Sequence, residues 1–131
     1  MTLLPVTLAA AAAAAILNVW LMVRVGRVRL SEKVSVGDGG NESVIRSMRA
    51  HSNFIESAPF VLILLAVIEL SGKGGSWLGL VALIFIIGRI MHGFGMDGGK
   101  LGKGRMFGTI ITMLTLIGLA VAAVLIGADI L

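Results

Sequence analysis

Residues 46–70 decide the fold of this chain, and they read RSMRAHSNFIESAPFVLILLAVIEL. The stretch begins with charged and polar side chains, and from residue 59 onward it is apolar except for Glu69. An apolar run that follows a polar start with no glycine in between predicts one long helix that enters a bilayer and crosses it. Residues 44–70 are therefore expected to form a spanning helix whose first turns are polar.

The composition of the whole chain agrees with a membrane environment. Of its 131 residues, 57% are hydrophobic and 14% are charged, and the mean hydropathy is +1.02, which is far too apolar for a soluble domain. A spanning helix needs roughly 20 residues, so the chain has room for about four spans with their connections. We expect an all-α integral membrane protein, a four-transmembrane-helix bundle that forms a single domain of residues 1–131, with spans near residues 3–23, 44–70, 77–96 and 105–126.

Glycine-rich polar segments, which favour turns and interrupt helices, separate the four spans. Asn41 or Ser43 is expected to cap the second helix, and Glu42 lies near the positive end of the helix dipole. Trp20 and Trp77 stand where interfacial aromatic side chains anchor a span. The connections are expected at residues 30–43, 71–76 and 97–104.

The basic residues predict the orientation of the chain in the membrane. The first connection and its borders carry five of them, the third carries three, and the second carries only Lys73. Because Lys and Arg concentrate on the cytoplasmic side, we expect the first and third connections to face the cytoplasm and both termini to lie on the opposite side. The first apolar run has no basic residue before it, which favours a retained span over a cleaved signal peptide. The concentration of Lys and Arg in short connections, rather than on a broad basic face, also disfavours nucleic acid as a partner.

The chain has no cysteine, which excludes disulfides, thiolate metal sites and a protein thiol nucleophile. Any sulfur chemistry therefore needs a thiol that a ligand brings. No metal site is expected either, because the carboxylates and the two histidines show no ligand spacing.

Four polar residues form one stripe on the second helix. At about 100° per residue, Arg46, Arg49, Asn53 and Glu56 fall within an arc of roughly 80°, whereas His51 points away from it. A stripe of this kind is costly next to lipid, so it must face protein, water or a polar ligand. Two interpretations stay open: Glu56 pairs with Arg49 or another cation and only joins helices, or the arginines bind a small polyanion.

The third and fourth spans add further charged groups. Arg89 and His92 are three residues apart and share a helix face. Arg89 lies too deep to reach an interface readily, so a partner such as Glu56 is expected, whereas an isolated His92 near a helix end is more often an interfacial residue than a base. Arg105 opens the fourth span, close in depth to the arginines of the second helix if the helices pack as a bundle. Converging guanidinium groups suit a small polyanion from the cytoplasm or, in competition with it, a lipid headgroup.

These residues together resemble the MAPEG family, the membrane-associated proteins of eicosanoid and glutathione metabolism, and in particular its microsomal glutathione S-transferases of bacterial type. The resemblance runs from about residue 25 to residue 105. Its most specific part is the motif Arg46-x-x-Arg49-Ala50-His51-x-Asn53-x-x-Glu56-x-x-Pro59-Phe60. Two shorter motifs follow family positions in the same order, namely Gly26-x-Val28-Arg29-Leu30 and Gly88-Arg89-x-x-His92.

The resemblance implies a four-helix protomer, a homotrimer, and glutathione bound between neighbouring subunits near the cytoplasmic face. Arg105 resembles the arginine that stabilises the glutathione thiolate, because a guanidinium beside the sulfur lowers the pKa of the thiol and raises the fraction of nucleophilic thiolate. The positions that resemble glutathione-contacting or supporting residues are Arg29, Arg46, Arg49, Asn53, Glu56, Arg89 and His92.

The sequence departs from the family pattern at three positions. Met96 stands where several relatives have a tyrosine that contacts glutathione, and the chain has no tyrosine at all. Ser52 stands where some relatives have arginine. Met106 follows Arg105 where the prostaglandin-forming branch has serine, so prostaglandin synthesis is not supported. A first loop shorter than in animal relatives, together with the high alanine and glycine content, favours a bacterial inner-membrane protein.

The leading hypothesis is a membrane glutathione S-transferase that joins glutathione thiolate to lipophilic electrophiles or reduces lipid hydroperoxides. The alternative is a non-enzymatic family member that binds lipid or a partner, which the missing tyrosine favours. A small proton-coupled multidrug exporter fits the size and span count, but the first span lacks the acidic residue that such exporters share. The sequence identifies no electrophile, and it assigns no role to Asp38, His51 or Glu69.

Overall fold

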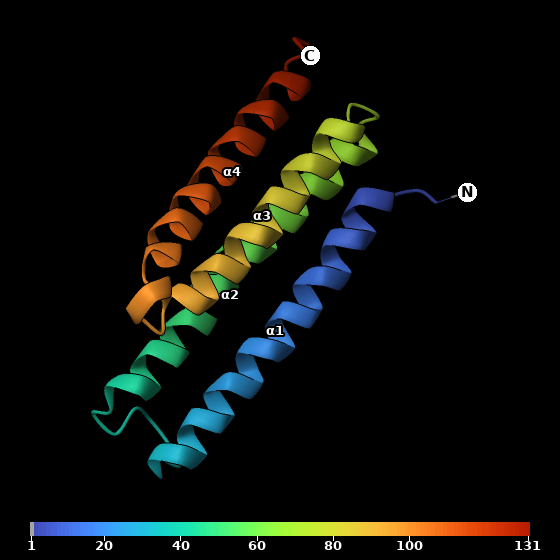
Figure 1. Ribbon diagram of the computed structural model, residues 1–131. Coiled ribbons are helices and arrows are strands. Elements are labelled where there is room, and N and C mark those ends of the chain that lie inside the picture. The colour runs from blue at the N-terminus through green and yellow to red at the C-terminus, as the bar shows by residue number, and fades with distance from the viewer. Residues whose placement is uncertain (1) are drawn as a thin grey trace.

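The computed structural model describes residues 2–131 as four long helices (Figure 1). Within these residues every regular element is helical, which confirms the all-α prediction, and all four long helices are long and apolar enough to cross a membrane. The elements are α1 (Pro5–Glu32), α2 (Glu42–Leu70), α3 (Ser76–Gly95), the 3₁₀ turn η1 (Gly99–Leu101) and α4 (Lys103–Gly127).

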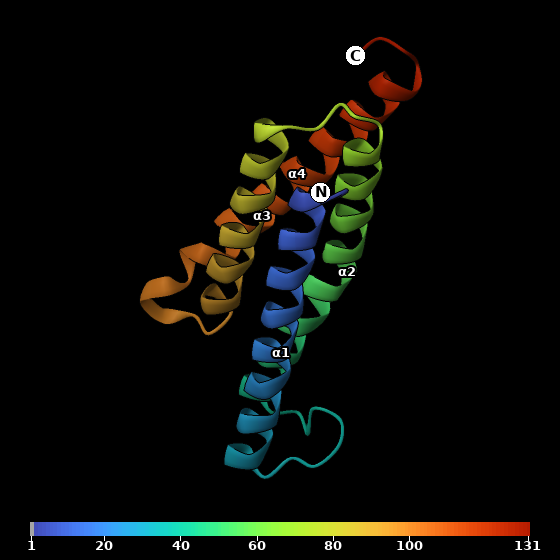
Figure 2. The same ribbon diagram turned by 90° about the vertical axis from the view of Figure 1, so that its right-hand side faces the viewer.

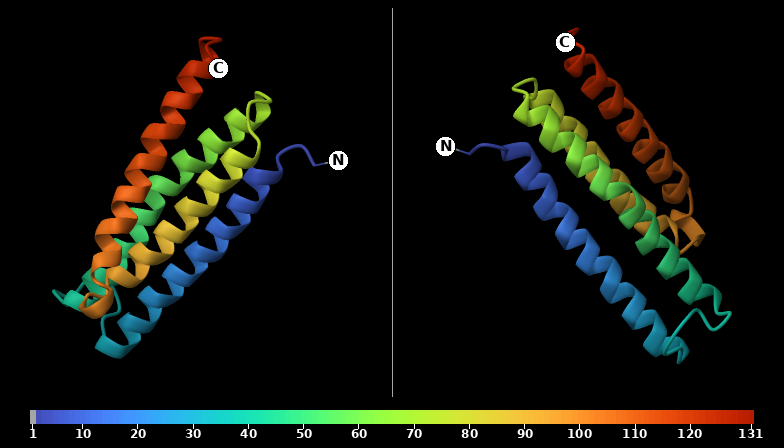
Figure 3. Two further views of the ribbon diagram at one scale, coloured as in Figure 1. Left: turned by 45° about the horizontal axis from the view of Figure 1, so that its top comes forward. Right: turned by 180° about the vertical axis from the view of Figure 1, so that it is seen from behind.

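The helices run antiparallel, so that the connections fall at opposite ends of the bundle. Residues 33–41 and 96–102 lie at one end, here called the basic end, and both termini and the α2–α3 turn lie at the other (Figure 1). In the tilted view and in the view from behind, α2 and α3 occupy the middle, with α1 on one flank and α4 on the other (Figure 3). All segments predicted to share a side of the membrane therefore share an end of the bundle.

Helix α1 continues well past the end of its apolar run. It extends through the arginines that follow residue 23 and ends at Glu32, where Lys33 adopts the left-handed conformation with a φ of 59°. Arg29 in the last turn lies near the negative end of the helix dipole, which favours the extension. The apolar run of the sequence thus marks the membrane-spanning part of α1 but not the length of the helix.

The start of α2 agrees with the capping prediction. The side chain of Asn41 accepts a hydrogen bond of 3.1 Å from the backbone N–H of Val44, and Glu42 stands in the first turn. The amide group of Asn41 also donates to Glu32 at 2.9 Å, which joins the cap of α2 to the last residue of α1. The short first connection is therefore closed by side chains that the sequence places at its two borders.

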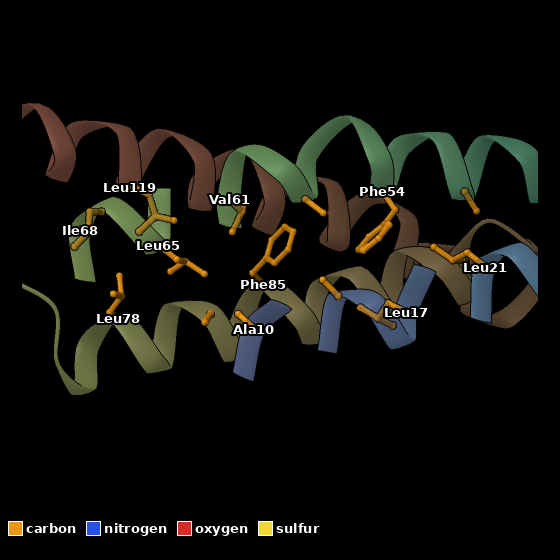
Figure 4. Close-up of a cluster of buried hydrophobic side chains, with 14 residues drawn as sticks. Ala10, Leu17, Leu21, Phe54, Val61, Leu65, Ile68, Leu78, Phe85 and Leu119 are labelled. Atoms are coloured by element: carbon orange, nitrogen blue, oxygen red, sulfur yellow. The ribbon is translucent and has the colours of Figure 1, made fainter. Parts of the chain in front are cut away.

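The interior of the bundle is a continuous apolar core. Phe54, Val61 and Leu65 of α2 pack with Phe85 of α3 and Leu119 of α4 (Figure 4). Large apolar side chains also cover the outside, because water is absent there and lipid is the solvent. The most exposed of these within the spans include Ile16, Phe60, Ile63, Leu114 and Val124.

Helices α3 and α4 touch backbone to backbone at the basic end and lean apart toward the C-terminus (Figure 2). A Cβ atom added at Gly104 would lie 2.5 Å from the carbonyl oxygen of Met91, and one at Gly108 would lie 2.5 Å from that of Gly88. A Cβ atom at Gly95 would overlap the backbone around Arg105. Small residues allow this close approach, which is the common basis of helix association in membranes.

We expect Gly108→Ala to lower the stability of the bundle by about 1–3 kcal/mol, because the added methyl group must displace backbone that cannot move independently. Gly118→Ala is the matched control on the same helix, since a Cβ atom there would meet nothing within 4 Å. Thermal unfolding of the two variants in detergent provides the comparison. Equal melting temperatures would contradict the close contact between α3 and α4.

Glu69 of α2 caps the beginning of α1. Its carboxylate accepts hydrogen bonds from the backbone N–H groups of Val6 and Thr7 at 2.8 and 2.9 Å and from the Thr7 hydroxyl at 2.7 Å. Leu4, the residue before α1, provides no side-chain cap of its own. A carboxylate from another helix thus satisfies the free N–H groups and the positive dipole end of α1.

Replacing Glu69 with Ala should destabilise the protein by about 1 kcal/mol, the usual loss when a helix cap is removed. Asp129→Asn serves as the control, because Asp129 is exposed near the C-terminus, makes no side-chain hydrogen bond among the described residues, and has a φ of 56° that Asn tolerates. Amide hydrogen exchange of residues 6–8 gives a local readout, and exchange should accelerate there in the Glu69 variant. Unchanged exchange would show that the carboxylate does not hold α1.

Candidate functional site

Arg89 occupies the centre of a polar cluster that joins three helices. Its side chain on α3 is 3% exposed, and its guanidinium donates to Oδ1 of Asn53 on α2 at 2.7 Å and to Oγ1 of Thr112 on α4 at 3.0 Å. A longer contact of 3.4 Å reaches Nδ1 of His92, which is equally buried. The expectation that Glu56 partners Arg89 is wrong, because the face of α2 that turns toward α3 presents Asn53, whereas Glu56 is exposed.

The charge of Arg89 is not balanced by a carboxylate within residues 2–131. The ion pairs of this part of the chain are Arg24–Asp97 and Arg46–Glu42, and neither involves α3 residues in the core. The Nε atom of Arg89 is buried and has no hydrogen-bond partner among the described residues. Neutral acceptors thus satisfy only part of the guanidinium, and its positive charge has no counter-ion among residues 2–131.

A hollow of about 530 Å³ lies between α1 and α2 toward the basic end. Arg29 lines it and donates to the carbonyl oxygen of Gly37 at 2.5 Å, which ties the side chain to the first connection. Glu56 lines the same hollow. Arg29 and Glu56 therefore line one hollow, and Asn53 is not part of its lining.

His51 also lines this hollow and has a partner on α1. Its Nε2 atom lies 2.7 Å from Oδ1 of Asn18, which acts as the acceptor and so places a proton on Nε2. His51 thus turns toward α1, whereas Asn53 of the polar stripe turns toward α3. A polar bond inside the apolar part of α1 explains why the span tolerates Asn18.

The remaining arginines of the candidate site differ in their contacts. Arg46 donates through Nε and Nη2 to Glu42 at 3.1 and 2.7 Å, and its Nη1 lies against Gly98 in the connection before α4. Arg49 and Arg105 are exposed, and their side chains make no hydrogen bond within residues 2–131. The predicted pairing of Glu56 with Arg49 is absent from this part of the chain, so the polar stripe does not neutralise itself.

Two residues beside the candidate site, Thr112 and Arg24, were not predicted from the sequence. Thr112 carried no signal except its position one helical turn after Gly108, and its role depends on a contact with another helix. Arg24 is one of the basic residues at the border of the first connection, and the sequence indicated only its value for predicting orientation. In the structure its guanidinium lies 5.2 Å from the ring centre of Trp20, donates to the carbonyl oxygen of Gly93 at 2.7 Å and pairs with Asp97. The spacing of Trp20 and Arg24, four residues apart on one helix, could have indicated their contact.

Thr112→Val should remove an acceptor from the buried guanidinium and lower the stability of the protein by about 1 kcal/mol. Thr115→Val is the matched control on the same helix, because the Thr115 hydroxyl is also buried but donates only to the carbonyl oxygen of Ile111. Thermal unfolding in detergent separates the two. An equal loss of stability in Thr115→Val would show that the hydrogen bond between Thr112 and Arg89 adds nothing to the stability of the protein.

Comparisons with known proteins fit this arrangement. The protein named inner membrane protein YecN of Escherichia coli strain K12 is 28% identical to the chain over 85 residues, and the protein of the same name from strain O6:H1 (CFT073) matches equally. Each match covers 62% of this chain and 65% of the relative, so the chain spans slightly less than two thirds of these proteins. Residues 7–125 match the profile of the MAPEG family, which covers all four helices almost completely. The chain is a member of the MAPEG family.

Proposed function

We propose that this protein is a membrane glutathione S-transferase that joins glutathione to lipophilic electrophiles. The observation that carries the proposal is the buried Arg89 guanidinium, which has an unpartnered Nε atom and no carboxylate partner within the described residues. Toward the basic end lie further arginines whose positions resemble those of family members that bind glutathione. A tripeptide with two carboxylates is a ligand of the charge that these groups require.

Each side chain has a chemical task in this proposal. Arg49 is exposed and binds a carboxylate of glutathione through paired hydrogen bonds. The amide oxygen of Asn53 accepts a hydrogen bond from Arg89, which fixes the orientation of the amide. Its NH₂ group is then free to donate to the peptide. Glu56 binds the ammonium group. Arg29, Arg46 and His92 support this set.

Arg105 stabilises the glutathione thiolate in the proposed reaction. The thiol proton leaves to solvent, and the thiolate attacks the electrophilic carbon, forming a C–S bond while the leaving group departs with its electron pair or the double bond accepts a proton. With a lipid hydroperoxide, two glutathione molecules become a disulfide while the hydroperoxide becomes an alcohol and water. The exposure of Arg105 at the start of α4 is consistent with access to a ligand from the basic end.

A homotrimer in a bacterial inner membrane is part of the proposal. Arg29 and Glu56 line one hollow beside α2, whereas Asn53 and Arg89 bond to each other and are not part of its lining. Because one protomer does not bring these groups into one pocket, a neighbouring subunit would complete the site. The basic end is placed in the cytoplasm, where glutathione is present, with both termini on the opposite side.

A non-enzymatic protein that binds lipid or a protein partner is the second candidate. Met96, which replaces the tyrosine of several relatives, is partly buried against the apolar core and offers no hydroxyl to a ligand. This function would retain anionic lipid at the arginines without a reaction of glutathione.

Calorimetric titration of the purified protein with glutathione tests the proposal. We expect binding to the unaltered protein, at least a tenfold weaker affinity for Arg49→Ala, and unchanged affinity for Arg27→Ala, an exposed arginine of α1 that makes no side-chain hydrogen bond within residues 2–131. Arg105→Ala should retain glutathione but lose most of its turnover with a lipophilic electrophile. No binding at millimolar glutathione would reject the transferase and favour the lipid-binding function.

A further inference from the structure

Arg24 joins α1 to the end of α3 through three kinds of contact. Its side chain is only 16% exposed, and its Nη1 atom donates to the carbonyl oxygen of Gly93 at 2.7 Å. Its Nη2 atom forms an ion pair with Asp97, the second residue after α3. The guanidinium also lies over the ring of Trp20, which adds a cation–π attraction.

The surface that receives Arg24 is shaped for close contact. Trp20 packs against Phe94 with a distance of 5.1 Å between ring centres. A Cβ atom at Gly93 would lie 2.7 Å from the Trp20 ring, so the ring lies directly on the backbone of α3. The Trp20 ring and the Arg24 guanidinium both belong to α1, and both contact residues 93–97. Helix α1 therefore holds the last turn of α3 in one position.

The connection from Asp97 to α4 is short and bonded throughout. Asp97 and Gly98 continue α3 as turns, with backbone bonds of 3.2 and 3.1 Å to Phe94 and Gly95. The 3₁₀ turn η1 follows, and the backbone N–H of Arg105 then donates to the carbonyl oxygen of Gly102 at 3.3 Å. A shift of Asp97 relative to α1 would therefore move the first turn of α4 with it.

We propose that Arg24 is a positioning residue that sets where Arg105 lies relative to α1 and α2. The inference rests on the proposed function for its catalytic consequence, because Arg105 is there the group that stabilises the thiolate. The glycine contact fixes Arg105 relative to α3, and Arg24 fixes the end of α3 relative to α1. The two contacts in series connect Arg105 to the helix that carries Arg29.

The two hydrogen-bond partners of Arg24, Asp97 and the carbonyl group of Gly93, differ in how strongly they hold its guanidinium. The side chain of Asp97 is 63% exposed, so water and salt screen its ion pair. Gly93 is buried, and its carbonyl oxygen accepts from a charged donor in a less polar setting. Removing the guanidinium should therefore displace α4 more than removing the charge of Asp97.

The first test measures the thiolate of bound glutathione by its ultraviolet absorbance as a function of pH, together with glutathione affinity. For Arg24→Gln we expect the apparent pKa of the bound thiol to rise toward that of free glutathione and kcat to fall about tenfold or more, since small misplacements of catalytic groups have effects of this size. Affinity should change by less than about threefold. Asp97→Asn should show the same changes to a smaller extent, and Arg27→Gln should show none.

The second test measures position without activity. The chain has no cysteine, so a pair of cysteines introduced at Val19 of α1 and Met106 of α4 can be spin-labelled without labelling any other residue. The side chains at these positions are 57% and 55% exposed. In spin-diluted samples in nanodiscs, Arg24→Gln should shift or broaden the distance distribution of this pair. The pair at Val19 and Ile63, which joins α1 to α2, is the control and should not change.

The outcomes separate this inference from the proposed function. An unchanged distance between positions 19 and 106 in Arg24→Gln would overturn the positioning role, whatever the activity. A shifted distance with an unaltered thiol pKa, in a protein that forms the thiolate, would overturn it as well. Absence of any thiolate in the unaltered protein would instead reject the proposed transferase, and the distance measurement would still decide whether Arg24 positions Arg105.

Discussion

The burial of one positive charge in an apolar bundle constrains the rest of the structure. Arg89 lies inside the membrane-spanning region, where an unsatisfied guanidinium would be very unfavourable. Its partners are an amide on α2 and a hydroxyl on α4, so the three helices must adopt one register for these bonds to form. Because neutral groups provide the hydrogen bonds, the cluster orders the bundle and leaves the positive charge of Arg89 without a counter-ion among residues 2–131.

Close backbone contact supplies a second constraint. Glycines on α3 and α4 let the two helices meet at the basic end, where the carbonyl oxygens of Gly88 and Met91 leave no room for a side chain on the facing residues. Arg24 then holds α3 against α1. These contacts concentrate at the end that bears the candidate site, whereas α3 and α4 separate toward the termini (Figure 2).

Apart from the buried Arg89 and the control residue Arg27, the arginines fall into two groups that bear on the proposed function. Arg24, Arg29 and Arg46 make hydrogen bonds with the protein itself, and they hold the connections at the basic end in place. Arg49 and Arg105 are exposed and have no side-chain bond within residues 2–131. This division supports a binding site in which some guanidinium groups form the frame and others receive the carboxylates and the thiolate of a ligand.

The sequence by itself determined the class of the protein, its four spans, a cap of α2 at Asn41 or Ser43 and the motif that identifies its family, because hydropathy, helical period and capping depend on residues close together in the chain. The polar stripe was visible in the same way, but not its partners. Only the tertiary structure decided that Asn53 rather than Glu56 meets Arg89, that Glu69 caps α1, and that Arg24 reaches Asp97. Such contacts depend on the rotation and crossing of each helix, which packing between distant segments sets.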